Sequence, residues 1–188
     1  MLMPLGLLSQ GGGSGAADAF ELITTTVLGT AAASVTLSSI PATYSALQLR
    51  VVGRSANGTQ FDELLLRLNA DSGANYGYKQ IVIDTFTPGQ STATSQTGMR
   101  IYGLPANTAN ANNFSALKMD IQGYKDTAKK KSIRGFGGAV NFISSWAASG
   151  SLFAGLWNST TTVTSLTVST YSGSNLAVGT RVSLYGVL

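Results

Sequence analysis

The clearest pattern in the sequence is Leu117-Lys118-Met119-Asp120-Ile121-Gln122. Apolar and polar side chains alternate at every position, so an extended chain would place them on opposite sides. This period of two predicts a half-buried β-strand. The alternation recurs at residues 47–51, where Leu47, Leu49 and Val51 are separated by Gln48 and Arg50. The chain is therefore expected to build its core from amphipathic strands.

Similar short runs continue from Ala19 to the end of the chain. No segment of about 12 residues keeps the apolar spacing of an amphipathic helix. Residues 85–96 and 107–113 read as long surface loops, and residues 69–73 (Asn-Ala-Asp-Ser-Gly) read as a turn. Roughly ten short strands separated by turns predict an all-β sandwich or barrel. The runs expected to form strands are 20–28, 34–37, 47–51, 63–69, 79–84, 99–102, 117–122, 133–142, 146–157, 163–168 and 181–188.

Composition narrows the classes of function. The chain has 188 residues, 44% hydrophobic and only 11% charged, with neither Cys nor His. Disulfides, zinc sites of the usual kind, thiol nucleophiles and His-dependent triads are thereby excluded. Low charge fits a protein whose faces are covered by neighbouring subunits, and it also occurs in secreted or lectin-like β domains. No catalytic residue, metal site or cofactor is predicted.

One basic stretch carries as much charge as the whole chain. Residues 125–134 sum to +4, the same value as the formal net charge. Lys129, Lys130, Lys131 and Arg134 are therefore candidate contacts to an acidic partner, such as a subunit surface, a nucleic acid or an anionic glycan. Nucleic acid is the less favoured partner, because the nearest aromatic residues flank the stretch and are not interleaved with it. The alternative is a solvated, lysine-rich edge that blocks aggregation of sheets.

Residues 1–18 differ from the domain that follows at 19–188. Met1, Leu2, Leu5, Leu7 and Leu8 are large and apolar, and residues 9–15 form a Gly-rich tether. We interpret this arm as an anchor that docks in a neighbouring subunit, with a frayed terminus as the alternative. The apolar part is too short for a membrane span and lacks the basic start of a signal peptide.

Three other residue groups have competing interpretations. Asp62 and Glu63 are adjacent, so on a strand they would point to opposite faces and could not act as a glycosidase pair. Asn69, Asp71 and Asn75 could offer oxygen atoms to calcium, but their spacing favours a turn. Five aromatic residues could form a sugar-stacking platform, although such side chains more often pack in a core or an interface. These aromatic residues are Tyr76, Tyr78, Tyr102, Trp146 and Trp157.

Three segments resemble structural proteins of tailed bacteriophages. They are the opening at residues 20–54 with Ser34-Val-Thr-Leu-Ser-Ser-Ile-Pro41, the turn region at residues 66–76, and the closing strands at residues 157–186. The resemblance spans most of residues 20–188. It implies a jelly-roll β-sandwich and a symmetric oligomer, with a homotrimer favoured. Proteins of this group cement the head shell or belong to tails and fibres.

From the residues and the resemblance together, we expect a virion structural protein. The favoured role is a cement or decoration protein on the outer surface of the particle, where it binds the major capsid protein or another virion protein. The alternative is a tail or fibre module that recognises host surface glycans. An enzyme such as a glycan hydrolase is a third and weaker possibility.

Overall fold

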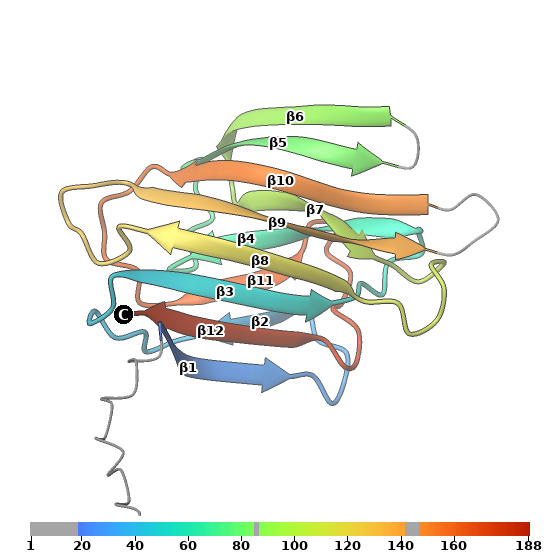
Figure 1. The fold of residues 1–188 in the computed structure, drawn as a ribbon, viewed down its shortest axis with the longest axis horizontal. Helices are drawn as coiled ribbons and strands as arrows, with labels where there is room; N and C mark the ends of the chain where they lie inside the picture. The colour runs from blue at the N-terminus through green and yellow to red at the C-terminus, as the bar shows by residue number, and fades with distance from the viewer. Residues whose placement is uncertain (1–18, 85–86, 142–146) are drawn as a thin grey trace, which may run out of the picture.

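A computed structural model of the chain describes residues 19–84, 87–141 and 147–188. These residues form twelve β-strands and no helix, which confirms the all-β prediction (Figure 1). The strands are β1 (Phe20–Val27), β2 (Ser34–Leu37), β3 (Ala46–Gly53), β4 (Phe61–Leu68), β5 (Tyr76–Asp84), β6 (Thr87–Gln96), β7 (Met99–Pro105), β8 (Ser115–Gln122), β9 (Lys131–Asn141), β10 (Ala147–Trp157), β11 (Leu166–Thr170) and β12 (Arg181–Val187).

The strands form two antiparallel sheets that pack face to face. The larger sheet has eight strands in the order β1-β12-β3-β8-β9-β10-β5-β6, and the smaller has four in the order β2-β11-β4-β7. In Figure 1 the larger sheet lies in front and the smaller one behind its lower and middle strands. The predicted β-sandwich is thus confirmed, with each sheet offering one inner and one outer face.

The pairing of the strands is nested along the chain. β1 pairs with β12, β2 with β11, β3 with β8, and β4 with β7, each pair antiparallel. The remaining four strands are two consecutive antiparallel pairs, β5 with β6 and β9 with β10. These two pairs extend the larger sheet beyond β8, which makes it twice as wide as the smaller one.

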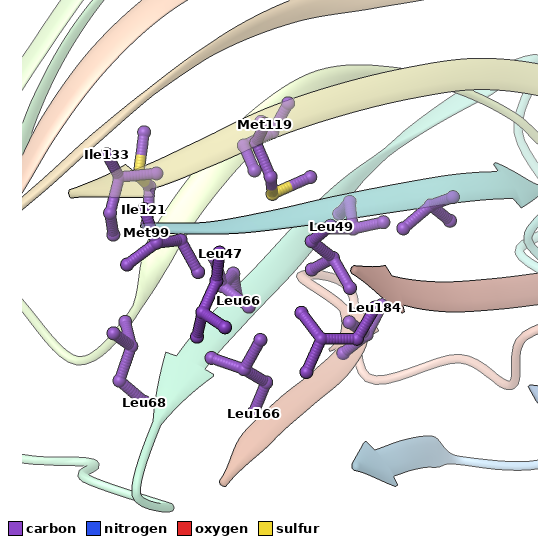
Figure 2. Packing of buried hydrophobic residues seen from close by; sticks show 14 of the residues in the cluster. Leu47, Leu49, Leu66, Leu68, Met99, Met119, Ile121, Ile133, Leu166 and Leu184 are labelled. Carbon is purple, nitrogen blue, oxygen red and sulfur yellow. The ribbon is translucent and has the colours of Figure 1, made fainter. Parts of the chain in front are cut away.

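The core lies between the sheets and contains the apolar half of each alternating strand. Leu47 and Leu49 of β3 and Met119 of β8 have no exposed surface, and they face Leu66 and Leu166 of the smaller sheet (Figure 2). Each such side chain contributes about 1.5–3 kcal/mol when it is fully buried. Packing of this core fixes which face of each strand points outward, because a shift of one residue would expose the apolar set.

Gly103 lets the two sheets approach closely. It has a positive φ of 116°, and a Cβ atom there would lie 3.1 Å from the Cα atom of Gly138 and from the carbonyl oxygen of Ser149. Residues with side chains rarely adopt this conformation, and the contact leaves no room for one. β7 therefore packs directly under β9 and β10.

One predicted loop is wrong and another is confirmed. Residues 107–113 form a loop, but most of residues 85–96 form the edge strand β6. β6 pairs with β5 and is rich in Thr, Ser and Gln, so its sequence carries no apolar alternation. Its backbone bonds to a strand that is already fixed, which stabilises an extended conformation without a buried face of its own.

Candidate interaction surface

The outer face of the eight-stranded sheet carries exposed apolar side chains. Every large apolar residue that is exposed on a described strand belongs to β1, β3, β5, β9 or β10, all in this sheet. Scattered single apolar residues are ordinary on protein surfaces, whereas a contiguous set marks an interaction site. The residues are Phe20, Leu22, Val27, Val52, Ile81, Phe136, Val140, Leu152 and Leu156.

Three of them are contiguous and form what we call the apolar row. Phe136 of β9 is in register with Leu152 of β10, which is in register with Ile81 of β5. Their side chains are 56%, 57% and 53% exposed, respectively. Directly opposite side chains on neighbouring strands are about 5 Å apart, so the three form one continuous ridge.

Shallow hollows lie on both sides of this ridge. One hollow of about 220 Å³ is lined by Phe136 and Leu152 together with the polar side chains of Lys118, Asp120 and Arg134. A second hollow lies between Phe136 and Val52, and a third lies along Ile81 and Leu152. A ligand can recognise a ridge between two grooves by its shape as well as by its apolar area. Such a surface favours a segment of protein chain as the ligand over a flat protein surface.

Cations lie along one side of the apolar row and at its β8 end. Arg50, Lys79, Lys118, Arg134 and Arg181 all project from alternating outward positions of five different strands. Of the described side chains on this face, Asp120 alone is a carboxylate. The net charge of the sequence equals that of residues 125–134, but sheet pairing also brings together on this face cations from distant parts of the chain.

A polar network fixes some of these charges. The Arg50 Nε donates a hydrogen bond to Oε1 of Gln48 at 2.8 Å, and the Gln48 Nε2 donates to Oδ1 of Asp120 at 2.9 Å. The guanidinium of Arg50 also lies 4.1 Å from the ring centroid of Tyr185. The Arg134 Nε is 3.9 Å from the Asp120 carboxylate, a weak and mostly solvated ion pair. The face therefore has an ordered, positively charged border.

The predicted basic site is divided by the structure. Residues 123–130 connect β8 to β9, two interior strands of the sheet, so the stretch is a hairpin loop and not a sheet edge. Lys129 and Lys130 are exposed there, and Arg134 is exposed on the outer face. Lys129 Nζ lies 3.4 Å from Oδ2 of Asp126, which leaves Lys130 as the freer charge of the loop.

Lys131 is a correction to the prediction, because it has no exposed surface. Its ammonium donates hydrogen bonds to the backbone carbonyl oxygens of Asp126, Lys129 at 2.8 Å and Thr160 at 3.0 Å. An ammonium has three protons to donate, and all three are used here. Lys131 therefore holds the hairpin loop against residues 158–163 and cannot meet a partner.

Core packing, the favoured interpretation of the five aromatic residues, is confirmed for three of them. Tyr76, Tyr78 and Trp157 are buried, and the rings of Tyr76 and Trp157 stack with centroids 6.3 Å apart. Burial raises the pKa of Tyr76 to about 12. Tyr102 is half-buried, and Trp146 lies outside the described residues. The buried rings of Tyr76, Tyr78 and Trp157 stabilise the sandwich and are not accessible to a sugar.

The suspected calcium ligands form the expected turn. Asn69 and Ala70 have positive φ values of 53° and 55°. The Asp71 carboxylate accepts hydrogen bonds from the Trp157 indole at 2.6 Å, from the Asn75 amide at 2.9 Å and from the Gly73 backbone at 2.8 Å. The bond from Trp157 is the main reason that the pKa of Asp71 is lowered. The hydrogen bonds of this carboxylate therefore join the turn to β10.

The adjacent carboxylates also have separate structural partners. Asp62 is buried and accepts hydrogen bonds from the hydroxyls of Ser55 at 2.6 Å and Ser172 at 2.7 Å. Glu63 forms a two-bond ion pair with Arg100, at 2.5 and 2.8 Å. Among the described residues no group of three or more Asp or Glu is placed to hold a metal ion.

The apolar arm at residues 1–18 lies outside the described residues, so its predicted contacts at Met1, Leu2, Leu5, Leu7 and Leu8 stay predictions. Its attachment point is defined, because Leu188 donates a backbone hydrogen bond of 3.3 Å to Ala19. The arm therefore joins the sandwich at β1, the edge strand of the larger sheet (Figure 1). In the part of the chain that the structure describes, no helix could cross a membrane.

Comparison of the chain with protein-family models, with curated proteins and with solved structures gives no match.

Proposed function

We propose that this protein is a structural component of a virus particle, and that it turns the outer face of its eight-stranded sheet toward neighbouring proteins. The difference between the two outer faces carries this proposal. One face has an apolar row with a cationic border. The other is lined by hydroxyl side chains, such as Thr36 and Thr167, whose oxygens are 3.1 Å apart. A block with one adhesive and one hydrophilic face suits attachment to a surface.

We further infer that the sandwich is a jelly roll with two inserted strand pairs. Without β5, β6, β9 and β10, the sheets have the orders β1-β12-β3-β8 and β2-β11-β4-β7. These are the orders obtained when one long antiparallel ribbon of nested pairs is rolled into two sheets, as in the jelly rolls of viral capsids and lectins. The four inserted strands widen the outer face, and they carry the whole apolar row.

The favoured role is a cement or decoration protein on the outside of a bacteriophage head. A subunit that binds only the assembled shell stabilises it by mass action, by about 2.7 kcal/mol at a free concentration 100 times the dissociation constant. The exposed cations of the outer face call for a partner surface that carries acidic groups. The major capsid protein is the proposed partner, and a trimer is the favoured assembly.

Quantitative mass spectrometry of purified particles tests this role. A cement protein is expected in a fixed ratio to the major shell protein, in hundreds of copies for each particle. Removal of the protein should lower the temperature at which the shell opens. A few copies for each particle would assign the protein to the tail, and its absence from particles would refute the proposal.

The exposed cations allow a second test of the same attachment. Changing both Lys129 and Lys130 to Ser should weaken attachment most at low salt, because solvent-exposed charges are screened within about 8 Å at physiological ionic strength. Arg67→Ser, on the outer face of the smaller sheet, is the matched control and should have no effect. Equal attachment of all three proteins at every salt concentration would exclude the loop from the contact.

The tail or fibre alternative has one observation in its favour. Tyr171, just after β11, is half exposed, and the Arg100 guanidinium covers its ring with 3.6 Å between the two centres. Beside it lies a shallow hollow lined by Arg67, Thr167 and Ser169. Aromatic rings next to hydroxyl and guanidinium groups are suited to sugars. Glycan-array binding that Tyr171→Ala abolishes would favour this role.

A further inference from the structure

The apolar row needs an occupant of a particular kind, because its size does not suit a globular partner. Three side chains that are little more than half exposed leave on the order of 300 Å² of apolar surface. A stable protein–protein interface buries about 800 Å² on each partner. The row therefore matches a short segment of chain that lies along a ridge between two grooves.

The charges around the row argue against pairing with the same face of a second copy. Lys79 and Arg134 are level with each other on the same side of the row, so face-to-face packing with the strands of the two copies parallel would place like charges opposite one another. Like charges placed opposite one another cost several kcal/mol and suppress an interface. An uncharged apolar segment avoids this cost, since it covers the ridge and leaves the cations in solvent.

The chain itself supplies such a segment. Residues 1–8 contain the five apolar side chains of the predicted anchor and also Met3, and they carry no charged side chain. We propose that residues 1–8 dock on the apolar row formed by Phe136, Leu152 and Ile81. This inference goes beyond the proposed function, because it holds for a head protein and for a tail protein alike.

The position of the arm makes the docking feasible. β9 is four strands from β1 in the larger sheet, which corresponds to about 19 Å at about 4.8 Å for each strand. Across the sheet, one position of β9 is level with Phe20, and Phe136 lies four residues further along β9 than that position. Four residues of strand add about 13 Å. Leu8 would thus lie about 23 Å from the start of β1. The ten residues between Leu8 and Ala19 span at most about 33–36 Å, so they reach the row of the same copy or of an adjacent one.

Engineered disulfides test the contact cleanly, because the chain has no cysteine. The full-length variant Leu5→Cys with Leu152→Cys should form a disulfide under mild oxidation about ten times faster than Leu5→Cys with Thr36→Cys, given the high effective concentration of docked partners. Thr36 is exposed on the outer face of the smaller sheet and serves as the matched control. Equal rates for the two pairs would refute the docking.

Mixing the single variants assigns the copy that receives the arm. If the arm docks on an adjacent copy, Leu5→Cys and Leu152→Cys proteins mixed together should give a linked dimer. If it docks on its own copy, only the double variant should react, and it should stay monomeric. Both results support the docking, and a lack of linkage in both experiments overturns it.

A labelling experiment checks the same contact without a disulfide. In the full-length chain, the thiol of Leu152→Cys should react with a maleimide several times more slowly than that of Thr36→Cys. Changing Leu5, Leu7 and Leu8 to Ser should remove the protection at position 152 and leave position 36 unchanged. Protection that persists with the polar arm would show that another surface covers the row, and the inference would fail.

Discussion

Replacement of Lys131 by Met is the sharpest test of how the basic hairpin is held. The substitution keeps most of the aliphatic stem and removes the ammonium. Three carbonyl oxygens, of Asp126, Lys129 and Thr160, lose their donor at once. Because Lys131 has no exposed surface, water cannot replace the lost donor at the same point.

The size of the effect follows from two opposing contributions. Hydrogen bonds from a charged donor are worth about 1.5–3 kcal/mol each, so three of them give a gross loss of about 4.5–9 kcal/mol. Removing a buried charge recovers part of its desolvation cost, which is several kcal/mol. We expect a net decrease of about 3 kcal/mol in the free energy of unfolding.

Urea denaturation followed by tryptophan fluorescence measures this decrease. With a slope of about 2 kcal/mol/M, the midpoint should fall by about 1.5 M. Lys130→Met changes an exposed neighbour and should alter stability by less than about 0.5 kcal/mol. If Lys131→Met costs less than about 1 kcal/mol, the ammonium does not hold the loop, and our reassignment of Lys131 from partner contact to structural residue is refuted.

The same residue predicts a dependence on pH. Burial lowers the pKa of Lys131 from its ordinary value of 10.5, and the nearby Asp126 opposes the shift. Between the lowered pKa and 10.5 the unfolded chain binds more protons at this residue than the folded one, so stability should rise with pH through that window. Lys131→Met should lack this rise. Identical pH slopes below 10.5 for the two proteins would contradict the assignment.

Two further substitutions test packing in other parts of the sandwich. Gly186→Ala places a Cβ atom 2.3 Å from the ring of Tyr44 and should cost about 2 kcal/mol in thermal unfolding, while Gly29→Ala, with nothing within 4 Å, should be nearly neutral. Asp71→Asn removes the negative charge of the group that accepts a hydrogen bond from the Trp157 indole. Because the pKa of Asp71 is lowered in the folded protein, this carboxylate contributes stability that is present above pH 3.8 and is lost as pH falls. The stability of the Asp71→Asn variant should therefore fall less steeply with acid. An unchanged acid unfolding curve would contradict a stabilising role for the Asp71 charge.

Local patterns predicted much of the secondary structure. The alternation in β3 and β8, the start of β2 at Ser34 and the turn at Asn69 were all readable, because side-chain direction and positive φ depend on neighbours in the sequence. β6 was not readable, because its extended conformation depends on pairing with β5. The resemblance to bacteriophage structural proteins stays a prediction.

The candidate surface was found only in part. The charge of Lys129 and Lys130 is visible in the sequence, but the burial of Lys131 is not, since it depends on a carbonyl of Thr160 about 30 residues away. Phe136 and Leu152 occur in glycine-rich runs without clear alternation, so their exposure could not be predicted. Knowing that both face outward required the register between β9 and β10.

An all-β chain of low charge with alternating strands is predictable from the sequence alone, because these properties belong to single residues and their nearest neighbours. Strand pairing alone places Ile81, Phe136 and Leu152 in one row and cations from five strands on the same face, and it buries one lysine of the basic stretch. Those facts arise from pairing between strands far apart in the chain. Such pairing is fixed by the shared core of the two sheets, and local sequence does not encode it.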